Sequence, residues 1–172
     1  MKKIETERKF IIEKPDIDIL KFQKGFTSSE ITQIYLTDSE KTHRIRKRSY
    51  SDGYTEYTEN TKKRISQMSV IECESVISES EFNVLKSSIE SGSSVLQKTR
   101  VTLDFLDKTL EIDIYPQWHR CAVLEVEIDR EDEKIELPHF IKVIKDVTGF
   151  REYSNHSMAY KFPSEDEIIN KV

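Results

Sequence analysis

Residues 122–130 read Ala-Val-Leu-Glu-Val-Glu-Ile-Asp-Arg, and this stretch decides the fold class. Every second residue from Leu124 to Ile128 is apolar, and the residues between them are acidic. A period of two places successive side chains on opposite faces of a β-strand. The stretch is therefore predicted to be a strand with one apolar face and one charged face.

The same alternation recurs along most of the chain, between polar turns such as Ser51-Asp52-Gly53. Eight strands are predicted, near residues 3–12, 32–37, 42–49, 54–63, 69–77, 95–104, 108–115 and 122–130. Most of the connections are too short for a crossover helix, so neighbouring strands are expected to be antiparallel. The segment from Asp104 to Lys108 is short enough to turn a hairpin.

A few segments have helical periodicity instead. The strongest runs from Ser78 to Ser91, because Ser78 and Glu81 match a capping box and Gly92 supplies a stop signal. Further helices are predicted over 138–148 and 155–161, with a turn of helix over 16–23. Strands with a few helices define an α+β fold, and the absence of linkers or repeats favours one domain over residues 1–172.

The composition excludes several classes of protein. No apolar run approaches the roughly 18 residues of a membrane span, and Glu5 interrupts the start before a signal peptide can form. A net charge of −5 argues against a protein that coats nucleic acid. Cys73 and Cys121 lack metal-ligand spacing and suggest free thiols in a reducing compartment. A cytoplasmic protein is expected, with no membrane and no nucleic-acid partner.

Charges of like sign occupy alternate positions on these strands. The basic sets are Arg44, Arg46 and Arg48, and Lys98 and Arg100; the acidic sets are Glu5 and Glu7, Glu72 and Glu74, Glu111 and Asp113, and Glu125, Glu127 and Asp129. Charged residues make up 34% of the chain, so chance alone places two charges in about 12% of such pairs of positions. Solvated outer faces of strands are therefore one interpretation.

A second interpretation places the charges inside. The helical stripes need an apolar sheet surface to cover, which leaves the charged faces of the strands on the opposite side. If the sheet closes into a barrel, acidic and basic strands would line one cavity, which has to stay hydrated because a dry ion costs several kcal/mol. Basic groups would bind a polyanion and carboxylates would hold its counter-cations, which predicts a metal–polyphosphate site.

Glu5-Thr6-Glu7-Arg8-Lys9 resembles the E-x-E-x-K signature of the CYTH superfamily, the triphosphate tunnel metalloenzymes. Further matches follow in order at Gln33-Ile34-Tyr35-Leu36, Arg44-Ile45-Arg46, Lys62, Glu72-Cys73-Glu74, Lys98-Thr99-Arg100, Asp113, Glu125-Val126-Glu127, Asp146-Val147-Thr148-Gly149 and Tyr153-Ser154-Asn155. Two positions depart from the family pattern: Val70 stands where a basic residue is frequent, and Asp146 where glutamate is.

The resemblance implies a closed eight-stranded antiparallel β-barrel, or tunnel, with a charged interior and helices outside. It also implies hydrolysis of inorganic triphosphate or a small organic triphosphate by phosphoryl transfer to water, with Mg²⁺ or Mn²⁺. Thiamine triphosphatase and class IV adenylyl cyclase activity, which makes cyclic AMP from ATP, are alternatives within the fold. A binding module without turnover is a third, although its acidic residues would then have no purpose. A monomer or homodimer is expected.

The resemblance also assigns roles to individual residues. The metal ligands it implies are Glu5, Glu7 and Glu127, with Asp113 and Glu125 close by. The substrate-binding residues it implies are Lys9, Arg44, Arg46, Lys62, Lys98 and Arg100, with Glu72 and Glu74 orienting these bases. The residues expected to be catalytic are Glu5, Glu7, Lys9, Arg46 and Glu127. Arg48 and Lys63 are expected to be exposed at strand ends, Trp118 to have a packing role, and the four histidines to be structural or on the surface.

Overall fold

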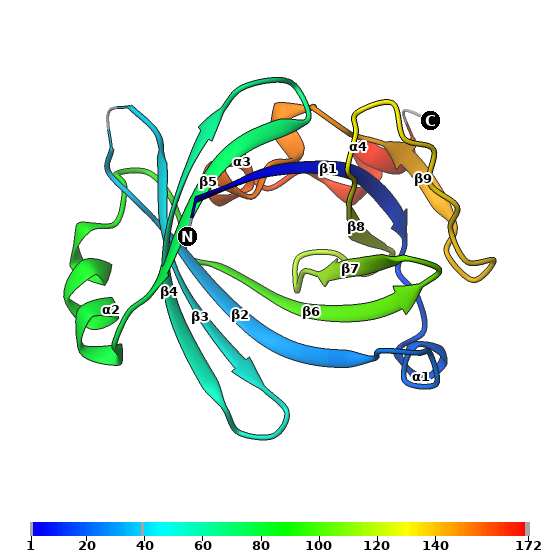
Figure 1. The fold of residues 1–172 in the computed structure, drawn as a ribbon, viewed down its shortest axis with the longest axis horizontal. Helices are drawn as coiled ribbons and strands as arrows, with labels where there is room; N and C mark the ends of the chain where they lie inside the picture. Colours follow the sequence, from blue (N-terminus) through cyan, green and yellow to red (C-terminus); the bar gives the residue numbers. More distant parts are fainter. Residues whose placement is uncertain (1, 39, 171–172) are drawn as a thin grey trace.

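Eight antiparallel strands close into a barrel in the computed structural model, which describes residues 2–38 and 40–170 (Figure 1). The strands are β1 (Lys2–Glu13), β2 (Thr27–Leu36), β3 (Thr42–Tyr50), β4 (Thr55–Arg64), β5 (Ser69–Val76), β6 (Leu96–Phe105), β7 (Lys108–Ile114) and β8 (Cys121–Glu127). They pair in the order β5-β4-β3-β2-β6-β7-β8-β1, and the β1–β5 pair closes the ring. The predicted α+β class and the closed eight-stranded antiparallel barrel are confirmed.

β1 has two successive partners along one edge. Its first part, Lys2–Thr6, pairs with β5, and Phe10–Ile12 pair with a short extra strand, β9 (Val143–Asp146). The predicted helix over 138–148 is therefore wrong. Because β5 ends its pairing at Thr6, the later backbone groups of β1 need other partners, and this long-range demand overrides the local helical pattern.

Four short helices decorate the barrel. They are α1 (Ile17–Leu20), α2 (Glu79–Leu85), α3 (Asn155–Tyr160) and α4 (Glu165–Ile169). Ser78 and Glu81 form the predicted capping box at the start of α2, which is shorter than predicted and continues as a 3₁₀ turn over Lys86–Ser88. The sequence also predicted the turn at α1 and the helix at α3, whereas α4 was not predicted. No helix among the described residues is long and apolar enough to cross a membrane.

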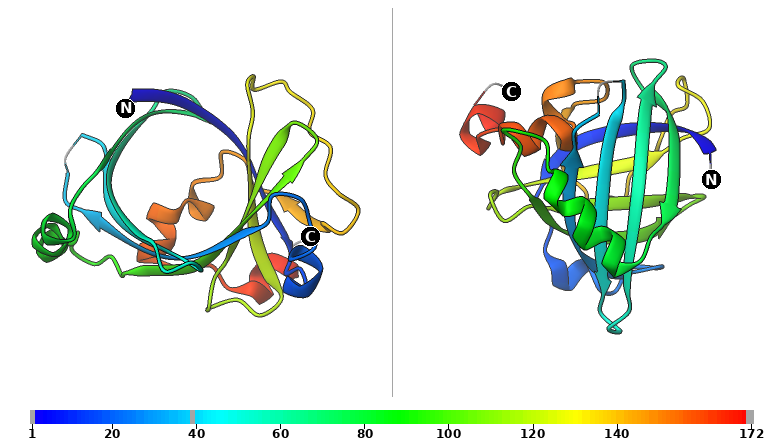
Figure 2. Two further views of the ribbon diagram at one scale, coloured as in Figure 1. Left: turned by 60° about the horizontal axis from the view of Figure 1, so that its bottom comes forward. Right: turned by 90° about the vertical axis from the view of Figure 1, so that its left-hand side faces the viewer.

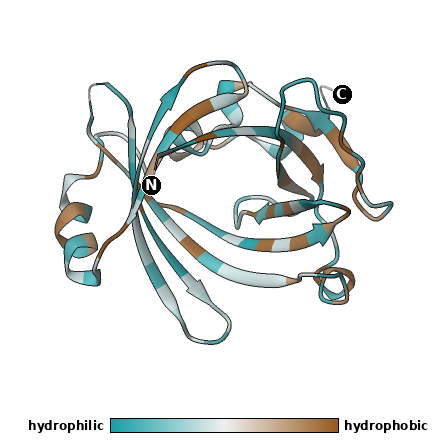
Figure 3. Cartoon of the chain, in the orientation of Figure 1, coloured by the Kyte–Doolittle hydropathy of each residue, from teal (hydrophilic) through white to brown (hydrophobic). Residues whose placement is uncertain are grey.

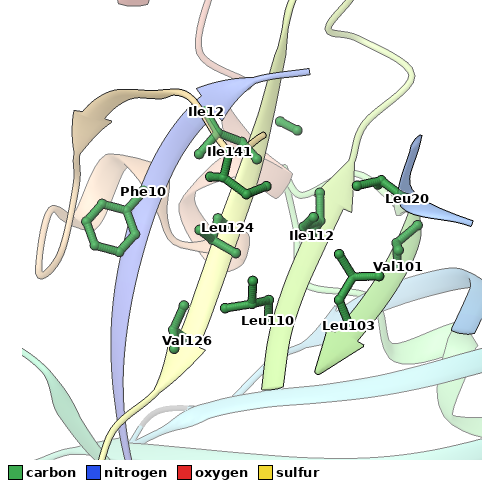
Figure 4. Close-up of a cluster of buried hydrophobic side chains, with 11 residues drawn as sticks. Phe10, Ile12, Leu20, Val101, Leu103, Leu110, Ile112, Leu124, Val126 and Ile141 are labelled. Carbon is green, nitrogen blue, oxygen red and sulfur yellow. The ribbon is translucent and has the colours of Figure 1, made fainter. Parts of the chain in front are cut away.

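The largest apolar cluster lies on the outer face of the sheet. Phe10, Ile12, Leu110, Leu124 and Val126 project from neighbouring strands and pack together (Figure 4). The hydropathy of the strands changes from residue to residue along their length (Figure 3). Since adjacent residues face opposite sides of a strand, an outer apolar face leaves the polar residues between them on the inside of the barrel.

A second apolar cluster fills one end of the barrel. Ile11 and Val123 share their strand faces with Lys9 and Glu125, and they pack with the buried Trp118. The Trp118 indole N–H donates to the Pro163 carbonyl oxygen at 2.8 Å, so the packing role expected for this residue is observed. In the left view of Figure 2, which looks into the barrel, α3 lies across the opening. The interior is thus apolar at one end and charged beyond it.

Candidate functional site

A cavity of about 590 Å³ occupies the charged part of the barrel interior. Side chains from β1, β2, β3, β4, β5, β6, β7 and β8 line it, together with residues at the start of α3. The charged side chains of alternate strand positions therefore converge on a common hollow, as the second interpretation of the sequence predicts. Of the charged residues that line it, the basic ones are Lys9, Arg44, Arg46, Arg48, Lys62, Arg64, Lys98, Arg100 and Arg151, and the acidic ones are Glu5, Glu7, Glu72, Glu74, Glu111 and Glu125.

The cavity is positive in a protein that is negative. Nine basic and six acidic residues line it, an excess of three positive charges, whereas the whole chain carries −5. The rest of the molecule consequently has a net charge that is more negative than the total. Walls of one dominant charge focus the field inside a low-dielectric cleft. This charge distribution favours the binding of an anion in the cavity over its binding elsewhere on the protein.

The innermost charges form a buried network, which we call the deep cluster and define as Lys9, Lys98, Arg100, Asp113 and Glu125. The Lys9 ammonium lies 2.7 Å from Glu125, and Arg100 Nη2 donates to Glu125 at 2.7 Å. Burial opposes the charge on Lys9, but Glu125 and Glu7 outweigh it and raise its pKa. Burial and the neighbouring Arg100 together lower the pKa of Lys98 to about 8.

Asp113 occupies the base of the deep cluster and has no exposed surface. Its carboxylate accepts from Arg100 Nε at 2.6 Å and Nη2 at 2.7 Å, and from Lys98 Nζ at 2.5 Å. The sequence placed Asp113 near a metal, but both of its oxygens are taken and it does not line the cavity. We therefore interpret it as the anion that positions Arg100 and Lys98.

Three arginines stand in a row on β3, at Arg44, Arg46 and Arg48. Arg46 donates to Glu74 at 2.8 Å and Arg44 to Glu72 at 3.4 Å. The Nε atoms of Arg44 and Arg46 are buried, and neither has a hydrogen-bond partner among the residues that the structure describes. Burial and the repulsion of Arg44 lower the pKa of Arg46. Buried, unpaired guanidinium donors are unusual and are stabilised by an anion.

Lys62 of β4 faces the cavity, as the sequence predicts. Its ammonium lies 2.5 Å from Glu5 and 3.3 Å from Glu72, so it bridges β1 and β5. Burial opposes the charge on Glu72, but Lys62 and Arg44 outweigh it and lower the pKa of that carboxyl. Lys63, one residue on, does not line this cavity.

The proposed metal ligands are only partly brought together. Glu5, Glu7 and Glu125 line the cavity, whereas Glu127 is exposed at the end of β8 and pairs with Lys3. Within residues 2–38 and 40–170, no three acidic, histidine or cysteine side chains are grouped as a metal site. The carboxylates form ion pairs with lysines instead: the Lys9 ammonium lies 3.4 Å from Glu7 and also pairs with Glu125.

Some lining residues were not assigned from the sequence. Arg48, expected to be exposed, lines the cavity and donates to Ser29 Oγ at 2.9 Å. Arg151 and His156 reach it from the segment before α3 and from α3 itself. The spacing of Arg48 from Arg46 was the available signal for the first. Nothing local in the sequence marks the other two, because the position of α3 is a consequence of the tertiary fold.

The fold is that of the CYTH, or triphosphate tunnel, proteins. A solved structure of the inorganic triphosphatase NE1496 matches with a TM-score of 0.59 and 24% identity, over 92% of this chain and 99% of that chain. PH1819 from Pyrococcus horikoshii OT3 matches with a TM-score of 0.57 and 19% identity, over 75% of this chain and 81% of that chain. No protein-family model matches the sequence, and no curated protein matches it.

Proposed function

We propose that this protein is a divalent-metal-dependent triphosphatase that hydrolyses inorganic triphosphate or a small organic triphosphate. The observation that carries the proposal is the positive cavity, in which the buried Nε donors of Arg44 and Arg46 have no partner within the described part of the chain. A planar guanidinium binds two phosphate oxygens at once, whereas lysine acts as a point charge. The fold of an inorganic triphosphatase, NE1496, supports the same reading.

Substrate phosphates would lie against Arg44 and Arg46. Lys62 and Lys9, which pair with Glu5 and Glu125 in this structure, would contact further phosphate oxygens. Lys62 would then exchange Glu5 for a phosphate oxygen, and the ion pair in this structure would open. Arg100 is already fixed by Asp113 and Glu125, so it meets the developing charge without reorganising. No side-chain nucleophile is required, because water attacks the terminal phosphorus as its bond to the bridging oxygen breaks.

The carboxylates of Glu5, Glu7 and Glu125, which line one side of the cavity, are suitable ligands for Mg²⁺ or Mn²⁺, because both ions prefer carboxylate oxygens. Glu5 and Glu7 would hold the ion, with Glu125 nearby, once phosphate oxygens engage the lysines that pair with them in this structure. The bound ion would neutralise phosphate charge and act as a Lewis acid. Glu127 would join only by leaving Lys3, and the buried Asp113 would act through the basic residues.

The test is phosphate release from tripolyphosphate, thiamine triphosphate and ATP, each with Mg²⁺ and with Mn²⁺. Arg46→Gln should lower kcat/KM about a hundredfold, the scale of one lost transition-state donor. Arg130→Gln is the matched control, because Arg130 is exposed and, among the residues that the structure describes, forms an ion pair with Asp132 alone. Chromatography of the ATP products separates phosphate release from cyclic AMP plus diphosphate. No phosphate release from any of the three compounds would reject the hydrolase.

Glu5→Gln separates hydrolysis from simple anion binding. The amide should remove most of the turnover, since it is a poor ligand for a hard cation. Binding of tripolyphosphate without metal should persist or strengthen, because Lys62 loses one of its two carboxylate partners. Unchanged turnover would reject the assignment of Glu5.

A further inference from the structure

A second cavity of about 420 Å³ lies beside the first and is distinct from it in most of its lining. Thr42, Lys62, Arg64 and His156 line both cavities, so the two are contiguous. The second one opens where β3 begins and β4 ends, next to the connection between β2 and β3. A ligand too long for the barrel interior can therefore continue into it.

Positive charge continues from one cavity to the other around the end of β4. Lys62, Lys63 and Arg64 are consecutive, and alternation turns Lys63 away from the barrel interior. Lys63 consequently lines only the second cavity, while its two neighbours line both. Lys41, just before the start of β3, also lines the second cavity. The basic residues of the second cavity therefore continue directly from those of the first, because Lys62 and Arg64 belong to both.

Most carboxylates near this second cavity are already engaged. Asp38 accepts from the backbone N–H groups of Glu40 and Lys41, at 2.9 and 3.1 Å. Glu90 lies 3.0 Å from the His156 ring, which leaves Glu40 as the remaining acidic group of the lining. Lys41 and Lys63, by contrast, form no ion pair with any residue that the structure describes.

The lining also offers little to a nucleoside as the next unit of the ligand. Leu36 is its one aliphatic residue among those described, and its rings are His43 and His156. No phenylalanine, tyrosine or tryptophan is among its described lining residues. The His156 ring already packs edge-on with Tyr35 and Tyr160, at centroid distances of 4.9 and 5.4 Å, so little aromatic surface is left on which a base could stack. An anionic extension fits this lining better than an aromatic one.

We propose that the second cavity is an extension of the phosphate site that binds linear polyphosphate chains longer than tripolyphosphate. The proposal deepens the proposed function, on which it rests, by naming the class of substrate. Successive phosphates would pass from Lys62 to Lys63 and Lys41, and the chain end would lie among the arginines of β3.

The test measures binding rather than turnover, so that it does not depend on catalysis. Calorimetric titration with tripolyphosphate and with a longer linear polyphosphate, in a chelator and without metal, gives the two dissociation constants. The double variant Lys41→Gln/Lys63→Gln should weaken binding of the longer chain about threefold to tenfold, the scale of two exposed ion pairs, and leave tripolyphosphate unchanged. Lys24→Gln is the control, because Lys24 carries the same charge, is exposed and lines neither cavity.

Each outcome decides the matter. Tighter binding of the longer chain that the double variant abolishes would support the extension site, even if no triphosphate is hydrolysed. Equal binding of both chains, a gain that survives the double variant, or no binding of either chain would overturn it. Tighter binding of a 5′-triphosphorylated RNA than of polyphosphate, with the same dependence on Lys63, would also overturn it in favour of a nucleic-acid ligand.

Discussion

Replacing Asp113 by asparagine tests whether the base of the cavity is a structural ion network. Asp113 is fully buried and accepts three hydrogen bonds from charged donors, two from Arg100 and one from Lys98. Asparagine keeps one acceptor oxygen and places an amide N–H₂ against the remaining donors. Hydrogen bonds to charged groups contribute about 1.5–3 kcal/mol each, and breaking a buried pair costs about 3–5 kcal/mol.

The response of Lys98 limits this cost. Its pKa is about 8 in the folded protein, so releasing its proton at neutral pH costs only about 1.4 kcal/mol. Arg100 keeps its bonds to Glu111 and Glu125. We therefore expect Asp113→Asn to lower the free energy of unfolding by about 3 kcal/mol, a large part of the 5–15 kcal/mol of an ordinary domain.

The assay is urea denaturation in a chelator, followed by the fluorescence of Trp118, the one tryptophan, which is buried. Asp107→Asn in the exposed turn between β6 and β7 is the matched control. Adding Lys98→Met to Asp113→Asn should recover part of the loss, because a buried ion pair can be replaced by apolar packing. A loss below about 1 kcal/mol without metal would refute the reasoning and favour a metal-ligand role for Asp113.

Three further results are expected. Burial opposes the charge on Asp113, but Arg100 and Lys98 outweigh it and lower the pKa of that carboxyl; Lys9 and Arg100 do the same for Glu125. The two ionised carboxylates therefore stabilise the fold above the unfolded-state pKa values near 4, and this contribution is lost as the pH falls below them. Measuring the free energy of unfolding as a function of acid pH will show the loss. Stability that does not fall with acid would contradict the network. Burial raises the pKa of the Cys121 thiol to about 11, so a thiol reagent should label only the exposed Cys73 rapidly in the native state, and two fast equivalents would be inconsistent with the fold. Ser78→Ala should lower stability by about 1 kcal/mol through loss of the capping box at α2, measured against Ser80→Ala within the same helix.

Local patterns predicted most of the fold because the strands obey one rule along their whole length. Period-two alternation located all eight barrel strands, and Ser78 with Glu81 located the start of α2. Helical periodicity, in contrast, gave a wrong prediction at residues 138–148, where Ile141 and Val147 are buried as expected but the backbone is not helical. That segment takes its conformation from the open edge of β1, which no local pattern reveals.

The sequence predicted most of the charged residues that line the cavity, but not which of them form ion pairs with one another. Alternation places Arg44, Arg46 and Lys98 on the strand faces opposite the apolar ones, closure of the barrel turns those faces inward, and register then decides what each residue meets. Pairing of β6 with β7 sets Arg100 opposite Asp113, which turns an expected ligand into a buried counter-ion. Glu127 illustrates the converse, because the end of β8 leaves it in solvent beside Lys3.

The position of β1 in the barrel has a consequence for how the chain folds. This strand carries Glu5, Glu7 and Lys9, yet it is held by β5 on one edge and by β8 on the other, and Glu7 lies opposite Glu127. Such distant pairing makes loop closure slow. During synthesis the earliest segment of the protein must wait for β8, its second neighbour, until nearly three quarters of the chain has emerged. A polyanion that arrives before then would find no binding site.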